Sequence, residues 1–201
     1  YLRQGIRLGL RALIHRRRGV KESVVWITGS GGLLGGELSA ALLKEGIPFA
    51  GTGREVDISD PAAAASFFEK NVSPCREDFS WIVNCAGFTD VDGAEEREEH
   101  AFSVNARGAG NLAELAEKNG AGLIHISSDY VFGGEKGAPY TEDDEPHPLS
   151  VYGRSKLEGE QRVRETLSRH VILRTSWLYG KPERGFFGAA VRSIRDGRVF
   201  P

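Results

Sequence analysis

Val24-Val25-Trp26-Ile27-Thr28-Gly29-Ser30-Gly31-Gly32-Leu33-Leu34-Gly35-Gly36 is the segment from which the architecture of this chain can be inferred. Its first five residues are a continuous β-prone apolar run, which is typical of a strand in a parallel sheet covered on both faces. Glycines follow at positions 29, 32 and 35, and Glu37 to Gly46 has the pattern of a helix that ends at a glycine. The segment therefore predicts a strand, a tight glycine turn and a helix in direct succession.

The spacing G-x-x-G-x-x-G indicates what such a turn is for. The first glycine permits the tight turn, the second lets backbone approach a pyrophosphate, and the third lets the helix pack closely on the strand. The N-terminus of the helix then faces the phosphates. The strand–turn–helix context is the one that this fingerprint requires, and a glycine-rich turn without a ligand is the alternative. We predict a dinucleotide site that includes Gly29, Gly31, Gly32, Leu33, Leu34 and Gly35.

The composition of the 201-residue chain is that of an ordinary globular protein, with 40% hydrophobic residues, 27% charged residues and a formal net charge of -2. This near balance gives no reason to expect nucleic acid or a membrane as a partner. No apolar run approaches the ~20 residues that span a bilayer, and no secretory signal pattern is present. Cys75 and Cys85 are too few for a disulfide framework. Reduced thiols and a cytoplasmic location are therefore expected.

Both ends of the chain suggest a piece of a longer protein, because it begins at Tyr1, lacks methionine and ends at Pro201. Residues 1–22 are rich in Arg and Lys, with apolar residues at helical spacing. This pattern predicts an amphipathic basic helix, which is either an arm for RNA or a membrane surface or simply a linker. We expect three parts: a basic N-terminal extension or linker (1–22), a dinucleotide-binding domain (23–180) and the beginning of an incomplete substrate-binding region (181–201).

The end of the second predicted strand, Pro48 to Arg54, bears on the choice of cofactor. An acid at this point usually binds the ribose 2′-hydroxyl of NAD, whereas an arginine suits the 2′-phosphate of NADP. Gly53 and Arg54 stand here, so NADPH is favoured over NADH, with a merely solvent-exposed Arg54 as the alternative. Val56 to Ile58 is predicted as a third, short strand that places Asp57 beside the adenine. The cofactor residues expected in this region are Arg54, Asp57 and Ile58.

A further strand is predicted from Trp81 to Gly87, and its small last residues suit close passage of a cofactor. Asp60 and Pro61 before it predict a capped helix that continues to about Asn71. One continuous helix is expected from about Glu95 to Gly120. Within it, Asn105 is either a buried group that bonds neighbouring backbone or a support of the active site. The cofactor residues expected here are Cys85, Ala86, Gly87 and Asn105.

The candidate catalytic residues are Ser128, Tyr152 and Lys156. A strand at 123–128 would deliver Ser128 to the carboxyl edge of the sheet, where open α/β folds bind ligands. On a helix at 150–168, Tyr152 and Lys156 share one face. An ammonium near a phenol lowers a pKa that is ordinarily ~10, and such a tyrosine can exchange a proton with a carbonyl oxygen. Taken alone, a Tyr-x-x-x-Lys pair is equally compatible with surface decoration.

The remaining C-terminal part is predicted to hold a long acidic loop at 129–148, a sixth strand at 171–175 and a helix at 186–196. The loop is a candidate rim of the active site. Together with the motifs above, four segments resemble the extended short-chain dehydrogenase/reductases, and within them the dTDP-4-dehydrorhamnose reductase family. The resemblance covers roughly Val24 to Pro201. These segments are Phe88–Glu95, Ser127–Gly134, Pro148–Gly153 and Leu173–Gly180.

The resemblance implies an α/β fold with a doubly wound parallel sheet (Rossmann) and only the start of a smaller C-terminal substrate domain. It implies NAD(P)H-dependent reduction of the C4 ketone of a nucleotide-linked 4-keto-6-deoxy sugar, as in dTDP-L-rhamnose synthesis, without a metal. Ser128 would polarise the ketone, Tyr152 would donate the proton, and Lys156 would support Tyr152 and bind the nicotinamide ribose. Tyr152 and Lys156 thus count as cofactor residues too. The substrate residues would be Thr89, Asp129, Tyr130 and Trp177.

The sequence also departs from the family pattern, and other functions remain open. Family members generally continue beyond the point that corresponds to Pro201, and the basic arm is not part of the pattern. A nucleotide-sugar dehydratase usually has Asp-Glu where Asp129-Tyr130 stands here, and an epimerase typically has small residues. A non-catalytic regulatory subunit that retains the fold is the alternative from another class. Homo-oligomer formation is left open.

Overall fold

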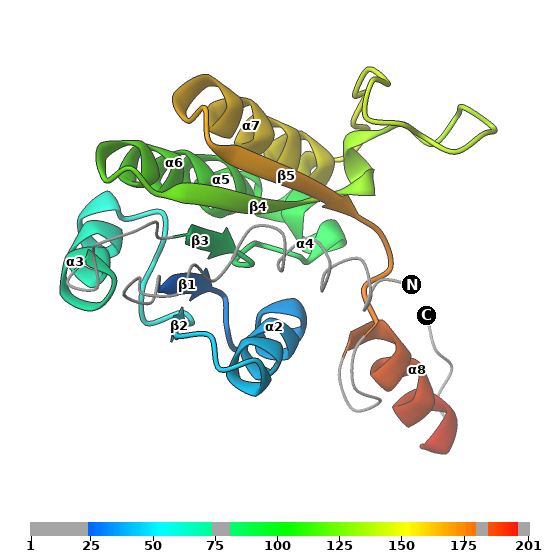
Figure 1. The fold of residues 1–201 in the computed structure, drawn as a ribbon. Helices are drawn as coiled ribbons and strands as arrows, with labels where there is room; N and C mark the ends of the chain where they lie inside the picture. The colour runs from blue at the N-terminus through cyan, green and yellow to red at the C-terminus, as the bar shows by residue number, and fades with distance from the viewer. Residues whose placement is uncertain (1–23, 74–80, 180–184, 197–201) are drawn as a thin grey trace.

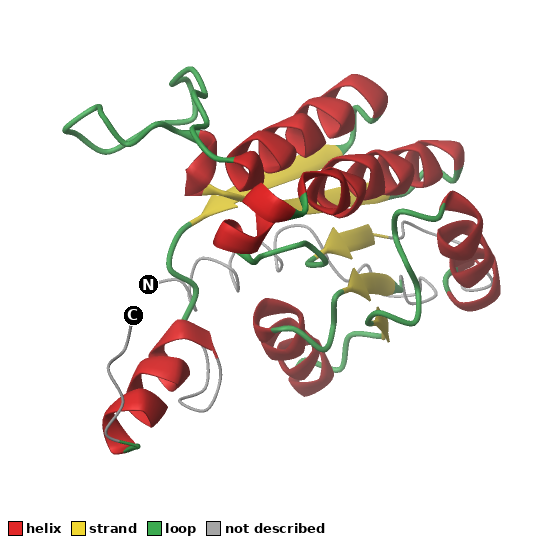
Figure 2. Ribbon diagram, turned by 180° about the vertical axis from the view of Figure 1, so that it is seen from behind, coloured by secondary structure: helices red, strands yellow, loops and turns green. Residues whose placement is uncertain are grey.

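One parallel sheet with the strand order β2-β1-β3-β4-β5 forms the centre of the protein. The computed structural model describes residues 24–73, 81–179 and 185–196, and Figures 1 and 2 show the sheet between layers of helices. Because the order reverses between β1 and β3, the sheet is doubly wound, as predicted, and its ligand crevice is expected at that point. The strands are β1 (Val25–Thr28), β2 (Phe49–Thr52), β3 (Trp81–Asn84), β4 (Gly122–Ser128) and β5 (His170–Thr175).

The connections between the strands are mostly helical. Helix α2 starts directly after the glycine turn, four residues before its predicted start. Helix α3 has the predicted cap: Asp60 Oδ1 accepts from the N–H groups of Ala62 and Ala63 at 2.9 and 3.2 Å, and Pro61 is its first residue. The helices are α2 (Leu33–Lys44), α3 (Pro61–Asn71), α4 (Val91–Glu96), α5 (Glu98–Phe102), the π-helical turn η2 (Ser103–Arg107), α6 (Gly108–Lys118), the 3₁₀ turn η3 (Asp129–Val131), α7 (Val151–Thr166) and α8 (Gly185–Arg195).

Alternate residues of the strands face two separate hydrophobic clusters, as expected for a sheet covered on both faces. On one face, Trp26, Ile82 and Leu123 are buried with residues of α3, α6 and α7. On the other face, Val25, Ile27, Trp81, Val83 and Ile124 are buried with Leu38 and Leu42 of α2. Figure 1 shows α6 and α7 over one face and α2 beneath the other. The sheet is therefore rigidly held from both sides.

The predicted third strand at Val56–Ile58 is wrong, because these residues form a turn segment after β2. Their polar groups are satisfied by side chains instead of by a neighbouring strand. Asn111 of α6 donates to the carbonyl groups of Ile58 and Ser59 at 3.0 and 3.1 Å. Ile58 itself is buried against α6, at the position where Gly108 leaves room for it. The short apolar pattern thus reflects packing under α6.

The single helix predicted from about Glu95 to Gly120 is also wrong, because it is interrupted at Arg97 and distorted at η2. Arg97 lies outside the helical conformation (φ −126°, ψ 45°). Its guanidinium pairs with Asp90 at 2.5 Å and lies over the Phe88 ring, 4.9 Å from the centroid. Asp90 also caps α4 by accepting from Gly93 N–H at 3.0 Å. These local contacts outweigh continuation of the helix.

Several predictions concern residues that the structure does not describe. They are the basic helix in 1–22 and the reduced state of Cys75. The division into three parts also rests partly on such residues and stays a prediction. Within the described ranges, no helix is both long and apolar enough to cross a membrane.

Candidate active site

The glycine turn between β1 and α2 is built so tightly that two of its residues must be glycine. Gly29 has φ +65°, and a Cβ there would lie 2.7 Å from Ala86 N at the end of β3. A Cβ on Gly35 would lie 2.8 Å from Ser30 Cα and would also collide with the carbonyl of Gly29. The turn, the start of α2 and the end of β3 therefore meet with only backbone between them. Such a cradle fits the pyrophosphate of a dinucleotide.

Substituting Gly35 by alanine should destabilise the full-length protein by about 1 to 3 kcal/mol, because the added methyl group must displace backbone. Gly31→Ala is the matched control, since a Cβ there meets nothing within 4 Å. The free energy of unfolding in urea measures both. An equal cost for the two variants would contradict the close contact between Gly35 and the turn.

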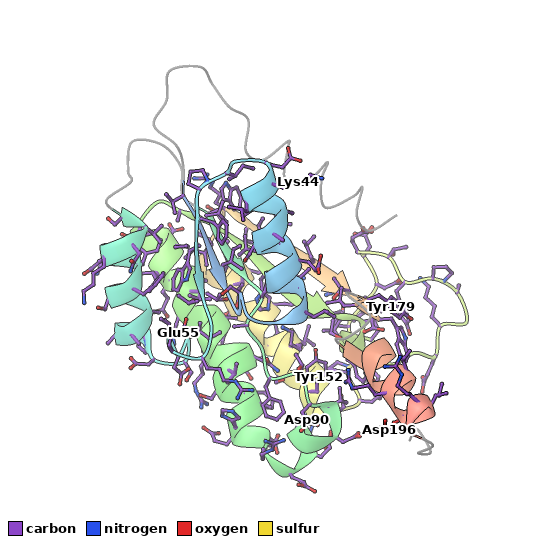
Figure 3. All side chains as sticks on the ribbon, turned by 90° about the horizontal axis from the view of Figure 1, so that it is seen from below. Lys44, Glu55, Asp90, Tyr152, Tyr179 and Asp196 are labelled. Atoms are coloured by element: carbon purple, nitrogen blue, oxygen red, sulfur yellow. The ribbon has the colours of Figure 1, made fainter. Side chains whose placement is uncertain are left out.

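Ser128 and Tyr152 meet at the carboxyl edge of the sheet. Ser128 is the last residue of β4, and its hydroxyl lies near enough to the Tyr152 phenol to lower the pKa of that phenol. Ser128 Oγ also donates to Asp129 Oδ1 at 3.1 Å and accepts from Tyr130 N–H at 3.2 Å. The Tyr130 and Tyr152 rings pack edge to face, with centroids 5.4 Å apart. Figure 3 labels Tyr152 on α7.

The first turn of α7 is fixed by contacts that position Tyr152. Ser150 caps the helix by accepting from Gly153 N–H at 3.0 Å, and Glu95 of α4 accepts from Val151 N–H at 2.8 Å. A Cβ on Gly153 would collide with the carbonyl of Tyr130. Glycine at this position therefore lets α7 approach the Ser128–Tyr130 segment. The role of Glu95 has no local sequence signal, because its partner is 56 residues away.

Lys156 is buried one turn below Tyr152, and its Nζ donates to the carbonyl of Ile126 at 2.6 Å. Burial lowers its pKa to about 8, and the negative charge of Glu160 offsets part of this effect. Burial also raises the pKa of Tyr152, and the nearby Ser128 hydroxyl offsets only part of this effect. The predicted lowering of the tyrosine pKa by Lys156 is therefore wrong for this structure, because burial dominates and the lysine is bonded to backbone.

Asn105 is a buried group that bonds neighbouring backbone, which was one of its two predicted alternatives, and its support of an active site stays a prediction. It lies in the π-helical turn and is 1% exposed. Its Oδ1 accepts from Phe88 N–H at 2.9 Å, and its Nδ2 donates to Phe88 O and to Ser155 Oγ at 3.1 and 3.0 Å. Ser155 Oγ in turn donates to the carbonyl of Tyr152 at 2.8 Å. Asn105 thus ties the loop after β3 to α7, and its direct contact with a cofactor stays a prediction.

A buried polar cluster that was not predicted crosses the three central strands. Thr28, Asn84 and His125 lie side by side in register on β1, β3 and β4. Thr28 Oγ1 donates to Asn84 Oδ1 at 2.7 Å, and Asn84 Nδ2 lies 3.1 Å from His125 Nδ1. Asn84 Oδ1 also accepts from Ala86 N–H at 3.2 Å. The cluster thus holds the backbone at the end of β3 in place.

The buried groups nearest to Lys156 are held in their neutral forms. Burial and the Lys156 charge keep the pKa of His125 well below its ordinary value. Burial raises the pKa of the Cys85 thiol to about 12, so this free cysteine is a thiol at neutral pH. His125 is therefore a packed neutral histidine.

The other predicted site residues lie around this edge with different exposure. Arg54, Thr89, Asp129 and Tyr130 are exposed. Asp57 is also exposed, and its Oδ1 accepts hydrogen bonds from the N–H and the hydroxyl of Ser59, at 2.8 and 2.7 Å. Trp177 is 63% exposed and has a positive φ of 47°, which is uncommon for a bulky residue. Their contacts with a ligand stay predictions.

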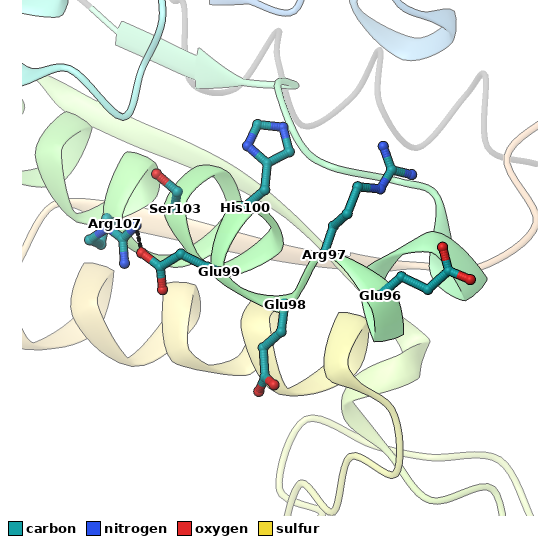
Figure 4. Close-up of a pocket in the computed structure, with 7 residues that line it drawn as sticks. All are labelled: Glu96, Arg97, Glu98, Glu99, His100, Ser103 and Arg107. Carbon is teal, nitrogen blue, oxygen red and sulfur yellow. Dashed lines mark hydrogen bonds and ion pairs between the residues drawn. The ribbon is translucent and has the colours of Figure 1, made fainter.

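A separate shallow hollow lies at the junction of α4, α5 and η2 (Figure 4). It is lined by Glu96, Arg97, Glu98, Glu99, His100, Ser103 and Arg107. Both arginines of this hollow form ion pairs: Arg97 pairs with Asp90 at 2.5 Å, and Arg107 pairs with Glu99 at 2.7 Å. Among the described residues, no group of His, Cys, Asp and Glu has the arrangement of a metal site.

Comparisons with known proteins agree with this geometry. The chain is 42% identical to the dTDP-4-dehydrorhamnose reductase of Mycobacterium tuberculosis (strain H37Rv) over 176 residues, which are 85% of this chain and 55% of the relative. It is 38% identical to a probable dTDP-4,6-dihydroxy-2-methyloxan-3-one 4-ketoreductase of Streptomyces antibioticus, with 86% and 58% covered.

Solved structures show the same relationship. The crystal structure of dTDP-4-dehydrorhamnose reductase from Bacillus anthracis in complex with NADP superimposes with a TM-score of 0.79 at 35% identity, and covers 87% of this chain and 60% of that one. The chain thus spans somewhat more than half the length of the relatives it matches. The model of the RmlD substrate binding domain family matches residues 23–199. The chain therefore belongs to the RmlD substrate binding domain family.

Proposed function

We propose that the full-length protein is an NAD(P)H-dependent reductase of the C4 ketone of a nucleotide-linked 4-keto-6-deoxy sugar, which would place it in dTDP-L-rhamnose synthesis. The observation that carries the proposal is that Ser128, at the carboxyl end of β4 in a doubly wound sheet, lies beside Tyr152 of α7. Two neighbouring hydroxyls at this edge can both reach one carbonyl oxygen. The relatives described as dTDP-4-dehydrorhamnose reductases support the same reaction.

The cradle at Gly29 and Gly35 fits a nicotinamide dinucleotide, because backbone alone separates the turn from Ala86. When bound, this cofactor supplies the hydride for the ketone carbon. The residues that would hold its phosphates are the glycine turn and the start of α2, with the end of β3 beside them. The small residues Ala86 and Gly87 leave space for it there. Lys156 would hold the nicotinamide ribose.

Tyr152 is suited to donate a proton to the ketone oxygen. Because burial raises its pKa, the phenol retains its proton at neutral pH. The Ser128 hydroxyl would polarise the same oxygen, and Lys156 would compensate the negative charge that develops on the tyrosine. The positive charge of Lys156 stabilises Tyr152 most strongly when the phenol gives up its proton and becomes negatively charged. These roles use only groups that the fold already brings together.

The substrate would be held around Tyr130, which packs against Tyr152, together with Thr89, Asp129 and Trp177. Tyr130 follows Asp129 at the position where a dehydratase of this superfamily would have a second acid. A ketone reduction needs no such acid, so simple reduction fits the residues better than dehydration. A nucleotide sugar and NAD(P)H are metabolites of the cytoplasm, and we infer that the protein works there.

Turnover by the full-length protein tests this function directly. NADPH should be consumed when a dTDP-linked 4-keto-6-deoxy sugar is added, with formation of the corresponding 4-hydroxy sugar. Tight cofactor binding without consumption would instead support a regulatory subunit that retains the fold. Consumption with loss of water from the substrate would support a dehydratase.

A further inference from the structure

We propose that Glu55 sets the balance between the two nicotinamide dinucleotides by filling, with its own carboxylate, the anion-binding turn that the 2′-phosphate of NADPH would use. This inference rests on the proposed cofactor. It extends the interpretation of the sequence, in which Gly53 and Arg54 at the end of β2 favoured NADPH and Glu55 had no role. In the structure, an acidic side chain does lie at the end of β2, because Glu55 folds back onto Gly53.

The turn that contains Glu55 lies beside the glycine turn. Thr52, the last residue of β2, is in register with Thr28 of β1, and its carbonyl accepts from Ser30 N–H at 2.8 Å. A Cβ on Gly51 would lie 2.9 Å from Ser30 Oγ. The end of β2 therefore borders the glycine turn directly. In dinucleotide-binding folds, residues at this point contact the adenosine ribose and decide between its 2′-hydroxyl and 2′-phosphate.

The carboxylate of Glu55 folds back onto the end of β2, and Figure 3 labels this residue. Its Oε1 accepts from Gly53 N–H at 2.6 Å. Its Oε2 lies 2.9 Å from the place that a Cβ on Gly53 would occupy, so glycine leaves this path open. The Gly53 N–H and the backbone N–H of Glu55 itself lower the pKa of the carboxyl group, which is therefore ionised at neutral pH. Successive backbone N–H groups in a turn are a general receptor for anions.

An internal carboxylate in this turn has opposite effects on the two cofactors. A 2′-phosphate carries about 1.5 to 2 negative charges, so it is repelled by Glu55 and must displace it from Gly53 N–H. A 2′-hydroxyl has no charge and can donate a hydrogen bond to the same carboxylate. Arg54, which is exposed next to Glu55, attracts the 2′-phosphate instead. The two neighbouring side chains thus act in opposite directions, and the protein should accept both cofactors.

Dissociation constants of NADPH and NADH, measured by calorimetry on the full-length protein without substrate, test this proposal. Glu55→Gln should tighten NADPH binding by about two- to fivefold, the size expected for an exposed charge contact, and should not tighten NADH binding. The gain should shrink as salt rises, because salt screens exposed charges. Arg54→Gln should weaken NADPH binding and leave NADH unchanged. Glu69→Gln is the matched control, since it removes an exposed acid on α3.

The outcomes separate this inference from the proposed function. An unchanged ratio of the two dissociation constants in Glu55→Gln, or a change equal to that in Glu69→Gln, overturns the role of Glu55 while the cofactor assignment stands. A wild-type protein that binds neither dinucleotide overturns both. Binding of 2′,5′-ADP and of 5′-AMP, which differ only in the 2′-phosphate, isolates that group: only 2′,5′-ADP should bind more tightly to Glu55→Gln. Equal gains for both ligands would show that the effect does not depend on the 2′-phosphate and would contradict the proposal.

Discussion

Replacing Tyr152 by phenylalanine in the full-length protein should lower kcat for the keto-sugar by about 100- to 10,000-fold, the usual contribution of a positioned general acid. The substitution removes the phenolic hydroxyl that lies near Ser128 and retains the ring that packs against Tyr130. Because the ring is kept, the fold and the dissociation constant of NADPH should change little. Steady-state kinetics and calorimetry on the same preparation separate the two effects.

The pH dependence of turnover provides a second readout of the same residue. A pKa that burial raises keeps Tyr152 protonated through neutral pH, so its capacity to donate a proton should fall only where the phenol ionises, on the alkaline side. Phe132→Leu is a suitable control, because it alters an aromatic residue of the loop that follows Tyr130 without removing a proton donor. Unchanged kcat in Tyr152→Phe would exclude Tyr152 as the donor.

The parts of this site that could be predicted from the sequence are those coded by local patterns. The glycine turn, the small residues after β3 and the Tyr152–Lys156 spacing each follow from the geometry of one strand or one helix. The doubly wound order of the sheet agrees with these motifs. The alternation of strands and helices along the chain predicts a parallel sheet. In such a sheet the carboxyl ends of the strands lie at one edge, so the residues that follow the strands are expected to come together there.

The features that escaped prediction depend on contacts between distant segments or on burial. Glu95 caps a helix that begins 56 residues later, and the helix that contains Asn105 is interrupted at Arg97 and distorted at η2. Val56–Ile58 has the composition of a strand, yet Asn111 satisfies its backbone. The pKa of Tyr152 was expected to fall because a charge stood nearby in sequence, whereas desolvation decides its direction. Each of these features depends on which residues meet in the folded chain, which the local sequence pattern does not show.

A buried ion pair joins the catalytic helix to β5 and has the same long-range origin. Glu160 of α7 is fully buried, and Arg174 of β5 binds it with two nitrogens, at 2.9 and 2.8 Å. Arg164 adds a further contact at 2.9 Å. The Arg174 guanidinium also lies over the Phe132 ring, 4.8 Å from its centroid. The pair thus connects α7, β5 and the loop that follows Tyr130.

Replacing Arg174 with alanine should lower the free energy of unfolding by about 3 to 5 kcal/mol at neutral pH, because the buried Glu160 carboxylate loses its main partner. Burial alone would raise the pKa of Glu160, but the bonds and charges of Arg174 and Arg164 lower it. Its contribution to stability is therefore present at neutral pH and lost as pH falls through the lowered value.

The difference between wild type and Arg174→Ala should accordingly shrink in acid. Glu158→Ala is the matched control, since its 2.7 Å pair with Arg162 is exposed and should be worth at most about 1 kcal/mol. Urea unfolding of the full-length protein at neutral and acidic pH measures both variants. If Arg174→Ala cost no more than Glu158→Ala at neutral pH, the ion pair would not be what holds α7 against β5. Since α7 also carries Tyr152 and Lys156, the stability lost in Arg174→Ala should be accompanied by a lower kcat, whereas Glu158→Ala should retain full turnover.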